Sequence, residues 1–131
     1  MNFDVIVIGS GPGGYVAAIR AAQLGLKTAV VEKAELGGVC LNWGCIPTKA
    51  LLKSAQVFEY INQASDYGIS VSGAKHDFNA VIKRSRDVAN GMSKGIQFLM
   101  KKNKIEVIRG YGKLIARGQV SVDNDGKKES H

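Results

Sequence analysis

Two closely spaced cysteines are the residues of this sequence best suited to chemistry. Cys40 and Cys45 are its only cysteines, and four residues separate them. Positions five apart on a regular helix differ by roughly 140° in direction, so a disulfide between them requires an irregular segment, which Gly44 and Pro47 permit. The ring would restrict the unfolded chain by only roughly 2 kcal/mol, which makes it a weak structural crosslink. A reversible redox bond is the better interpretation.

The residues around the cysteines favour a reactive thiol over a metal site. Cys45 is expected just before a helix and stands four residues before Lys49, so a helix dipole and an ammonium group would both favour its thiolate. A zinc site would need two more ligands, yet His76 and His131 are isolated and show no zinc-finger spacing. We therefore expect no metal and assign no chemistry to His76. A pair of inert buried thiols remains an alternative.

A second constellation of residues is typical of a dinucleotide site. The pattern Gly9-x-Gly11-x-x-Gly14 follows a short β-branched segment, and Pro12 suits the first turn of a helix. Glu32 follows about twenty residues later, at the end of the next apolar segment. Glycine patterns are common, so the alternative is a glycine-rich turn with an incidental glutamate. The strand, the helix and the acidic residue follow one another at the spacing of such sites, which favours the dinucleotide site.

Each residue of that constellation has a physical role. Gly9 permits the tight turn, Gly11 lets the backbone approach a pyrophosphate, and Gly14 lets the helix pack closely on the strand. The unpaired N–H groups and the dipole of the helix N-terminus favour phosphate. Glu32 can accept hydrogen bonds from both hydroxyls of a ribose, and its charge would repel a 2′-phosphate.

The remaining pattern predicts one domain, residues 1–131, of α/β class: a Rossmann-like parallel sheet with an antiparallel β-meander, as in a truncated FAD/NAD(P)-binding domain. We expect strands at 3–8, 28–32 and 105–108 and an edge strand at 119–123. We expect a first helix at 12–24, a second helix after a loop at 36–47, and a third helix that begins after an N-cap at Asp77. Residues 124–131 are polar, and we expect no closing element there. The predicted buried positions are Leu51, Ala55, Phe58 and Ile61 on the second helix, and Phe78, Val81, Val88, Met92, Ile96 and Leu99 on the third. Gly91 and Gly95 interrupt the latter pattern and indicate a bend or a close approach to a ligand.

Composition and charge exclude several classes of protein. The net charge of +7 comes largely from lysines and arginines between residues 83 and 104, which alternate with apolar positions and predict a solvated helix face. Aromatic residues do not interleave with them, so we expect no nucleic-acid binding. No apolar run approaches the roughly 18 residues of a membrane span, and no signal peptide precedes the first strand. A cytoplasmic location is the default.

Together the two constellations predict a flavoprotein. A disulfide one helix away from a dinucleotide site requires a two-electron mediator, and a tightly held flavin fits better than NAD alone. Residues 9–14 read Gly-Ser-Gly-Pro-Gly-Gly, and residues 37–49 read Gly-Gly-Val-Cys-Leu-Asn-Trp-Gly-Cys-Ile-Pro-Thr-Lys. With Glu32, they resemble the N-terminal region of the FAD-dependent pyridine nucleotide–disulfide oxidoreductases. Residues 14–25 and 50–52 are most similar to the dihydrolipoamide dehydrogenases, while glutathione and mercuric reductases share the cysteine motif.

That resemblance implies roles for individual residues. Cys40 would be the interchange thiol that attacks the substrate disulfide, and Cys45 the thiolate that forms a charge-transfer complex with the flavin. Lys49 would stabilise the reduced flavin, and Gly112 would pass along the FAD adenosine. The FAD contacts implied are Gly9, Gly11, Pro12, Gly14, Glu32, Lys33, Gly37, Gly38, Val39, Cys40, Lys49 and Gly112.

The resemblance also implies a reaction and partners. A lipoyl domain of a 2-oxo acid dehydrogenase complex or of the glycine cleavage system would deliver electrons through Cys40–Cys45 and FAD to NAD. Family members are homodimers with an NAD domain and a dimerisation domain, and a His–Glu pair crosses their subunit interface. We expect residues 1–131 to lack these parts, to hold FAD weakly and not to complete a turnover. The alternatives are a glutathione- or mercuric-reductase-like enzyme and a non-catalytic FAD-binding fragment.

Overall fold

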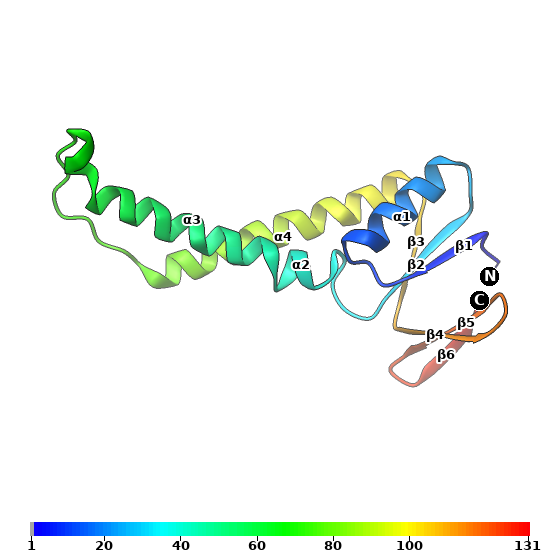
Figure 1. Cartoon of the computed structure of the whole chain (residues 1–131). Coiled ribbons are helices and arrows are strands. Elements are labelled where there is room, and N and C mark those ends of the chain that lie inside the picture. Colours follow the sequence, from blue (N-terminus) through cyan, green and yellow to red (C-terminus); the bar gives the residue numbers. More distant parts are fainter. Residues whose placement is uncertain (1) are drawn as a thin grey trace.

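A parallel sheet of three strands lies at the end of the molecule that carries both termini in the computed structural model, which describes residues 2–131 (Figure 1). The strand order is β1-β2-β3, and both pairings are parallel. The middle strand β2 is buried at every position. The continuous apolar run that leads into β1 predicted burial on both faces there, and this is wrong, because β1 is only half-buried and Ile8 is exposed. The strands are β1 (Val5–Ile8), β2 (Thr28–Glu32) and β3 (Glu106–Arg109).

Each face of the sheet has its own apolar core, because successive residues of a strand point to opposite faces. Val30 of β2 packs in a cluster with Ala18, Leu41 and Met100, on the side of the helices. Val31 packs with Val120 and Val122, on the side of the second sheet. The domain therefore has three layers: helices, parallel sheet and antiparallel sheet. This is the predicted Rossmann-like α/β arrangement.

Helix α1 (Pro12–Gln23) connects β1 to β2 and begins and ends where the sequence predicts. Pro12 occupies its first turn. At its end Gly25 has φ +87°, and the Leu26 amide donates to the Ala21 carbonyl at 3.2 Å. This is the left-handed cap that glycine permits.

The helices between β2 and β3 form a long arm that projects from the sheet (Figure 1). We call residues 45–102 the helical arm. Asp77 caps its second long helix, as predicted, by accepting from the amides of Asn79 and Ala80 at 2.9 and 3.2 Å. The short helix α2 (Gly38–Asn42) precedes the arm, which consists of α3 (Cys45–Asn62), a 3₁₀ helix η1 (Ala64–Tyr67) and α4 (Phe78–Lys102).

The predicted buried face of α4 is partly wrong. Ile96 is buried and Leu99 half-buried, but Phe78, Val88 and Met92 are exposed. The buried residues nearer the N-terminus of α4 are small: Ser85, Ala89 and Ser93. Small side chains let α4 approach α2 and α3 closely, which turns the larger apolar residues outward. On α3, Leu51, Phe58 and Ile61 are half-buried and Ala55 is exposed.

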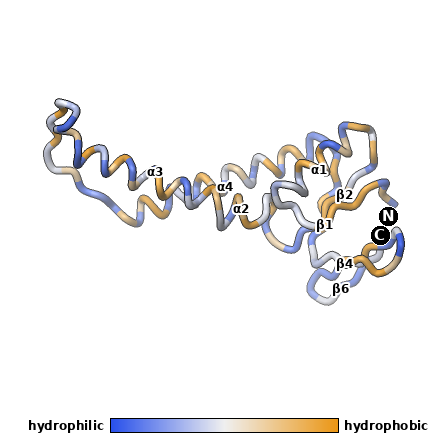
Figure 2. Tube along the Cα trace, viewed as in Figure 1, coloured by the Kyte–Doolittle hydropathy of each residue, from blue (hydrophilic) through white to orange (hydrophobic). Residues whose placement is uncertain are grey.

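Gly91 and Gly95 do not interrupt α4, and no described part of the chain approaches them closely. Helix α4 runs continuously through both, and a Cβ added at either would meet no atom within 4 Å. Figure 2 shows apolar residues along β1 and β2 and in patches along the arm. The arm gives the chain a surface of 8998 Å², whereas a compact monomer of the same mass exposes about 6700 Å².

The meander is complete in the described residues, which corrects two predictions. Its order is β4-β5-β6, so the segment predicted as an edge strand is the middle strand. The polar segment after Asn124 forms β6, which pairs with β5 across a turn where Asp125 and Gly126 have φ of +51° and +86°. The strands are β4 (Tyr111–Ala116), β5 (Gln119–Asn124) and β6 (Lys127–Ser130).

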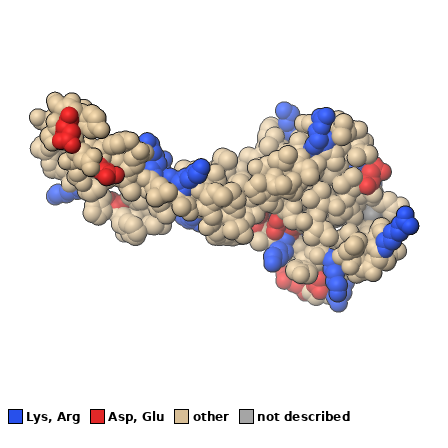
Figure 3. Space-filling model, in the orientation of Figure 1, with Lys and Arg blue, Asp and Glu red and all other residues tan. Residues whose placement is uncertain are grey.

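The basic residues do not form one patch on the face shown in Figure 3, where Lys and Arg side chains are scattered over the arm and the domain. Some of them are not simply solvated, because Arg84 and Arg86 donate to backbone carbonyls of the segment that carries the cysteines. No helix among residues 2–131 has the length and apolar character to cross a membrane.

Candidate functional site

The turn between β1 and α1 depends on its glycines. Gly9 has φ +94°, in the left-handed region, and its amide donates to the Val31 carbonyl at 2.8 Å. A Cβ on Gly14 would run into the carbonyl of Gly9. A larger residue would therefore strain the backbone at Gly9, and at Gly14 it would push helix α1 away from the strand. Both glycines have the structural roles that the sequence predicts.

The N-terminus of α1 is open to a ligand. Gly11 is the N-cap residue, and no side chain caps the helix. Pro12 has no N–H, and the amides of Gly13 and Gly14 precede the first amide that bonds within the helix, that of Tyr15 to the Gly11 carbonyl at 3.0 Å. These free donors and the positive end of the dipole suit an anion such as a pyrophosphate.

The segment that carries the cysteines packs directly on this turn. A Cβ on Gly38 would lie 2.8 Å from the Cα of Gly11. The Gly37 amide donates to the Ser10 carbonyl at 3.1 Å. Gly37 and Gly38 both have positive φ, +97° and +63°, so glycine is required there for conformation as well as for space. The two constellations of the sequence thus form one site.

Glu32 fixes the turn from the next strand. Its Oε2 accepts from the Ser10 amide at 2.9 Å and from the Ser10 hydroxyl at 2.6 Å, and its Oε1 accepts from the Ala34 amide at 2.9 Å. Burial raises the pKa of the Glu32 carboxyl, but the hydrogen bonds from Ser10 and Ala34 outweigh it and the pKa is lowered. A carboxylate has about four acceptor positions, so these three hydrogen bonds leave capacity on Glu32 for a further donor such as a ribose hydroxyl.

A cavity of about 210 Å³ opens beside Glu32. It is lined by Gly9, Glu32, Lys33 and Gly112, which the sequence assigned to the cofactor, together with Ile8, Val31, Gly110 and Tyr111. The Lys33 ammonium lies 5.7 Å from the centre of the Tyr111 ring. A Cβ on Gly112 would lie 2.9 Å from Val31 Cγ1, so the strand β4 passes close to β2 only because this residue is glycine. The structure brings these four residues together.

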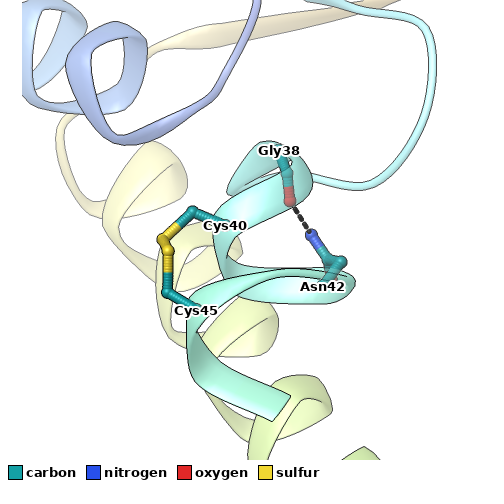
Figure 4. Close-up of a disulfide and its surroundings, with 4 residues drawn as sticks. All are labelled: Gly38, Cys40, Asn42 and Cys45. Atoms are coloured by element: carbon teal, nitrogen blue, oxygen red, sulfur yellow. Dashed lines mark hydrogen bonds between the residues drawn. A yellow bond between two sulfur atoms is a disulfide. The ribbon is translucent and has the colours of Figure 1, made fainter. Parts of the chain in front are cut away.

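Cys40 and Cys45 form a disulfide with their Cα atoms 4.8 Å apart (Figure 4). The irregular segment that this bond requires lies between α2 and α3, where Gly44 has φ −116° and ψ −112°. A Cβ on Gly44 would lie 3.0 Å from the Val39 carbonyl oxygen, so the chain can fold back only with glycine there. The predicted loop at 36–47 is wrong in two respects, because Cys40 lies within the short helix α2 and helix α3 already begins at Cys45 rather than after it.

Cys45 is the first residue of α3, where the positive end of the helix dipole lies. Its side chain is exposed, and that of Cys40 is half-buried. Lys49 follows one turn later on the same face of α3 and is exposed. Val39, on α2, is 69% exposed. One sulfur and one ammonium group are therefore accessible at the edge of the site.

Comparisons with known proteins show the family of this chain. Residues 3–130 match the model of the family described as pyridine nucleotide-disulphide oxidoreductase. The chain belongs to this family. It is 57% identical to a dihydrolipoyl dehydrogenase of Rhizobium etli over 96% of this chain, and 52% identical to one of Zymomonas mobilis over 98% of it.

The chain spans only about a quarter of these relatives, 26% of the first and 28% of the second. Among solved structures, it is similar to the HOCl-induced flavoprotein disulfide reductase RclA from Escherichia coli, determined as a Cu(II) complex. That similarity has a TM-score of 0.81 and 27% identity, and covers 99% of this chain and 26% of the other. The fold is therefore that of the corresponding region of a flavoprotein reductase.

The residues that hold the cysteine segment in place were not predicted from the sequence. Asn42 is buried, and its Nδ2 donates to the Leu36 carbonyl at 3.1 Å and to the Gly38 carbonyl at 2.9 Å, the second of which Figure 4 shows. Ser93 Oγ donates to the same Leu36 carbonyl at 3.0 Å, and Arg86 donates to the Asn42 carbonyl at 3.0 Å. The spacing of small residues on α4, at 85, 89 and 93, could have indicated this close packing.

The two histidines lie apart from the cysteines. The His76 ring packs against Phe58, with ring centres 5.3 Å apart, and the His131 ring lies 6.2 Å from that of Phe3. Within residues 2–131, no three His, Cys, Asp or Glu side chains gather so as to hold a metal ion. The chemistry that this region offers is that of its disulfide.

Proposed function

We propose that this chain is the FAD- and disulfide-bearing region of a dihydrolipoyl dehydrogenase. The observation that carries the proposal is the packing of Gly38 on Gly11, which fixes the Cys40–Cys45 segment against the dinucleotide turn. The 57% identity to the Rhizobium etli dihydrolipoyl dehydrogenase supports this member of the family, compared with 27% for the RclA reductase.

The described residues fit one end of an FAD molecule. The free amides of Gly13 and Gly14 suit its pyrophosphate, and the remaining acceptor capacity of Glu32 suits a ribose hydroxyl. The glycine backbone at position 112 leaves the cavity beside Glu32 open. When bound, FAD supplies a two-electron carrier between sulfur and nicotinamide. Lys49 would place a positive charge near the carrier and stabilise its reduced, anionic form.

The proposed step at sulfur is a two-electron exchange. The two thiols of a dihydrolipoyl group reduce the Cys40–Cys45 bond: that bond breaks, a new bond joins the two lipoyl sulfurs, and the two protons of the dihydrolipoyl thiols pass to the cysteines or to solvent. Cys40 would exchange with the substrate. Cys45 would remain as a thiolate, because it begins helix α3 and stands one turn from Lys49.

The complete reaction needs groups beyond those that the structure describes. We propose NAD as the final acceptor, a homodimer as the working enzyme, and the lipoyl domain of a 2-oxo acid dehydrogenase complex or of the glycine cleavage system as the partner. A proton acceptor must also serve the substrate thiol, and neither described histidine lies at the cysteines. Residues 1–131 by themselves are therefore expected to carry out the exchange at sulfur but not the reduction of lipoamide by NADH.

Counting thiols tests this proposal. Treatment with excess dihydrolipoamide under anaerobic conditions should produce two alkylatable thiols in the wild type and no new thiols in Cys40→Ser or Cys45→Ser, which have no disulfide to open. Dihydrolipoamide should open the bond faster than the same concentration of glutathione thiol. A disulfide that stays closed in excess dihydrolipoamide would refute the proposed substrate. Faster opening by glutathione would favour a glutathione-reductase-like enzyme instead.

A further inference from the structure

Helix α2 carries Cys40 and depends on α4 for its position. It is only five residues long, which is too short to be stable alone. Its core contact is Leu41, buried in the same cluster as Ile96 of α4. Two further contacts from α4 reach the backbone on either side of Cys40. Ser93 Oγ donates to the Leu36 carbonyl before the helix, and Arg86 Nη1 donates to the Asn42 carbonyl at its end.

The Asn42 carbonyl is the group that most needs such a donor. It belongs to the last residue of α2, so the helix offers it no amide partner. The next two residues, Trp43 and Gly44, form the irregular connection to Cys45. The guanidinium of Arg86 reaches this carbonyl from 44 residues away in the sequence, at 3.0 Å. A planar guanidinium presents its N–H donors in a fixed arrangement and so holds the carbonyl in place.

We propose that Arg86 is a positioning residue of the Cys40–Cys45 couple. By holding the Asn42 carbonyl it keeps the end of α2 turned back toward α3, and this keeps the two sulfurs within bonding distance. Without that contact the connection between the cysteines gains freedom. The effective concentration of one thiol at the other then falls, and the disulfide becomes easier to reduce. The proposal rests on the proposed function only in treating the disulfide as reversible.

The equilibrium with glutathione measures this effect without flavin or substrate. Two glutathione thiols reduce the Cys40–Cys45 bond and become one glutathione disulfide, and the two cysteines become thiols. In buffers of graded glutathione ratio, Arg86→Met should shift the equilibrium constant toward the dithiol by about 3- to 10-fold, the ordinary effect of one hydrogen bond. Arg86→Lys, which keeps the charge and one donor, should restore part of the shift.

Two further variants separate positioning from other effects. Lys83→Met removes a positive charge from the same helix, but Lys83 pairs only with Asp87 and is exposed, so its equilibrium constant should match the wild type. Loss of positive charge alone would stabilise a thiolate less and so favour the disulfide, the opposite direction. Ser93→Ala removes the second contact from α4 and should shift the constant in the same direction as Arg86→Met. If Arg86→Met does not fold, Arg86→Lys takes its place, and a constant on the disulfide side of the wild type would then overturn the proposal.

The outcomes are distinct. An equilibrium constant within twofold of the wild type in folded Arg86→Met, or a shift toward the disulfide, would overturn the proposal. Thermal unfolding by circular dichroism shows whether each variant is folded. If dihydrolipoamide fails to open the wild-type bond while the glutathione equilibrium still responds to Arg86→Met, the proposed function fails and the positioning role stands.

Discussion

Replacing Glu32 with glutamine tests whether this carboxylate holds the dinucleotide turn. The Glu32 side chain is 8% exposed and accepts three hydrogen bonds, two from Ser10 and one from the Ala34 amide. Glutamine has nearly the same shape but no charge, and one of its two terminal atoms is a donor. If its oxygen faces Ser10, its NH₂ group faces the Ala34 amide, so one hydrogen bond is lost and the other two lose their ionic acceptor.

The size of the effect follows from these contacts. A hydrogen bond to a charged group contributes about 1.5–3 kcal/mol to stability. The loss of one such bond and the weakening of two others predicts a decrease of about 2–4 kcal/mol in the free energy of unfolding at pH 7. Because folded domains are stable by only about 5–15 kcal/mol, urea unfolding followed by circular dichroism resolves this change.

The dependence on pH separates charge from shape. The pKa of Glu32 is lowered in the folded state from its ordinary value of 4.5, so its contribution is fully present above that value and is lost as the pH falls through the folded-state pKa. The difference in unfolding free energy between wild type and Glu32→Gln should therefore be constant near neutral pH and shrink below about pH 4.5. Glu106→Gln, at an exposed position of β3, should leave stability nearly unchanged. A Glu32→Gln variant as stable as the wild type at pH 7, or equally weakened at all pH values, would refute the reasoning.

Three further substitutions test the glycines and the cap. Gly14→Ala should lower stability by about 1–3 kcal/mol, measured by urea unfolding, because its Cβ meets the Gly9 carbonyl, whereas the matched control Gly13→Ala has free space and should not. Gly91→Ala should raise the melting temperature, since it adds about 0.5–1 kcal/mol of helix propensity at an open position of α4, and a lower melting temperature would contradict this. Asp77→Ala should cost about 1 kcal/mol of cap stability without moving the glutathione equilibrium of the cysteines.

The sequence predicted the glycine turn and the first strand, helix and strand well, because their constraints are local. The positive φ at Gly9 and the close approach at Gly14 each require glycine, and glycine can be read directly from the sequence. The same holds for the irregular connection at Gly44. The Asp125-Gly126 pair was a comparable signal for the last hairpin, since both residues adopt positive φ, but the polar flanking residues concealed it.

The helical arm was predicted less well because apolar periodicity does not say which face of a helix is covered. Up to Ser93 the buried positions of α4 carry small residues such as Ala89, while Phe78 is 66% exposed. The roles of Arg84 and Arg86 depend on carbonyls 34 and 44 residues away, which no local pattern reveals. Charged residues in a basic stretch of helix are usually solvated. Only the packing of α4 on α2 and α3 distinguishes Arg84 and Arg86 from the solvated basic residues.

We propose that the Cys40–Cys45 couple, once reduced, passes electrons to a flavin held at the first turn of α1. Anaerobic mixing of the chain with FAD and dihydrolipoamide, followed through the visible absorbance of oxidised flavin, tests it most directly. We predict that the wild type bleaches the flavin faster than FAD free in solution, and that Cys45→Ser does not, because that variant has no disulfide to mediate the transfer. Equal bleaching by wild type, Cys45→Ser and free FAD would contradict the account.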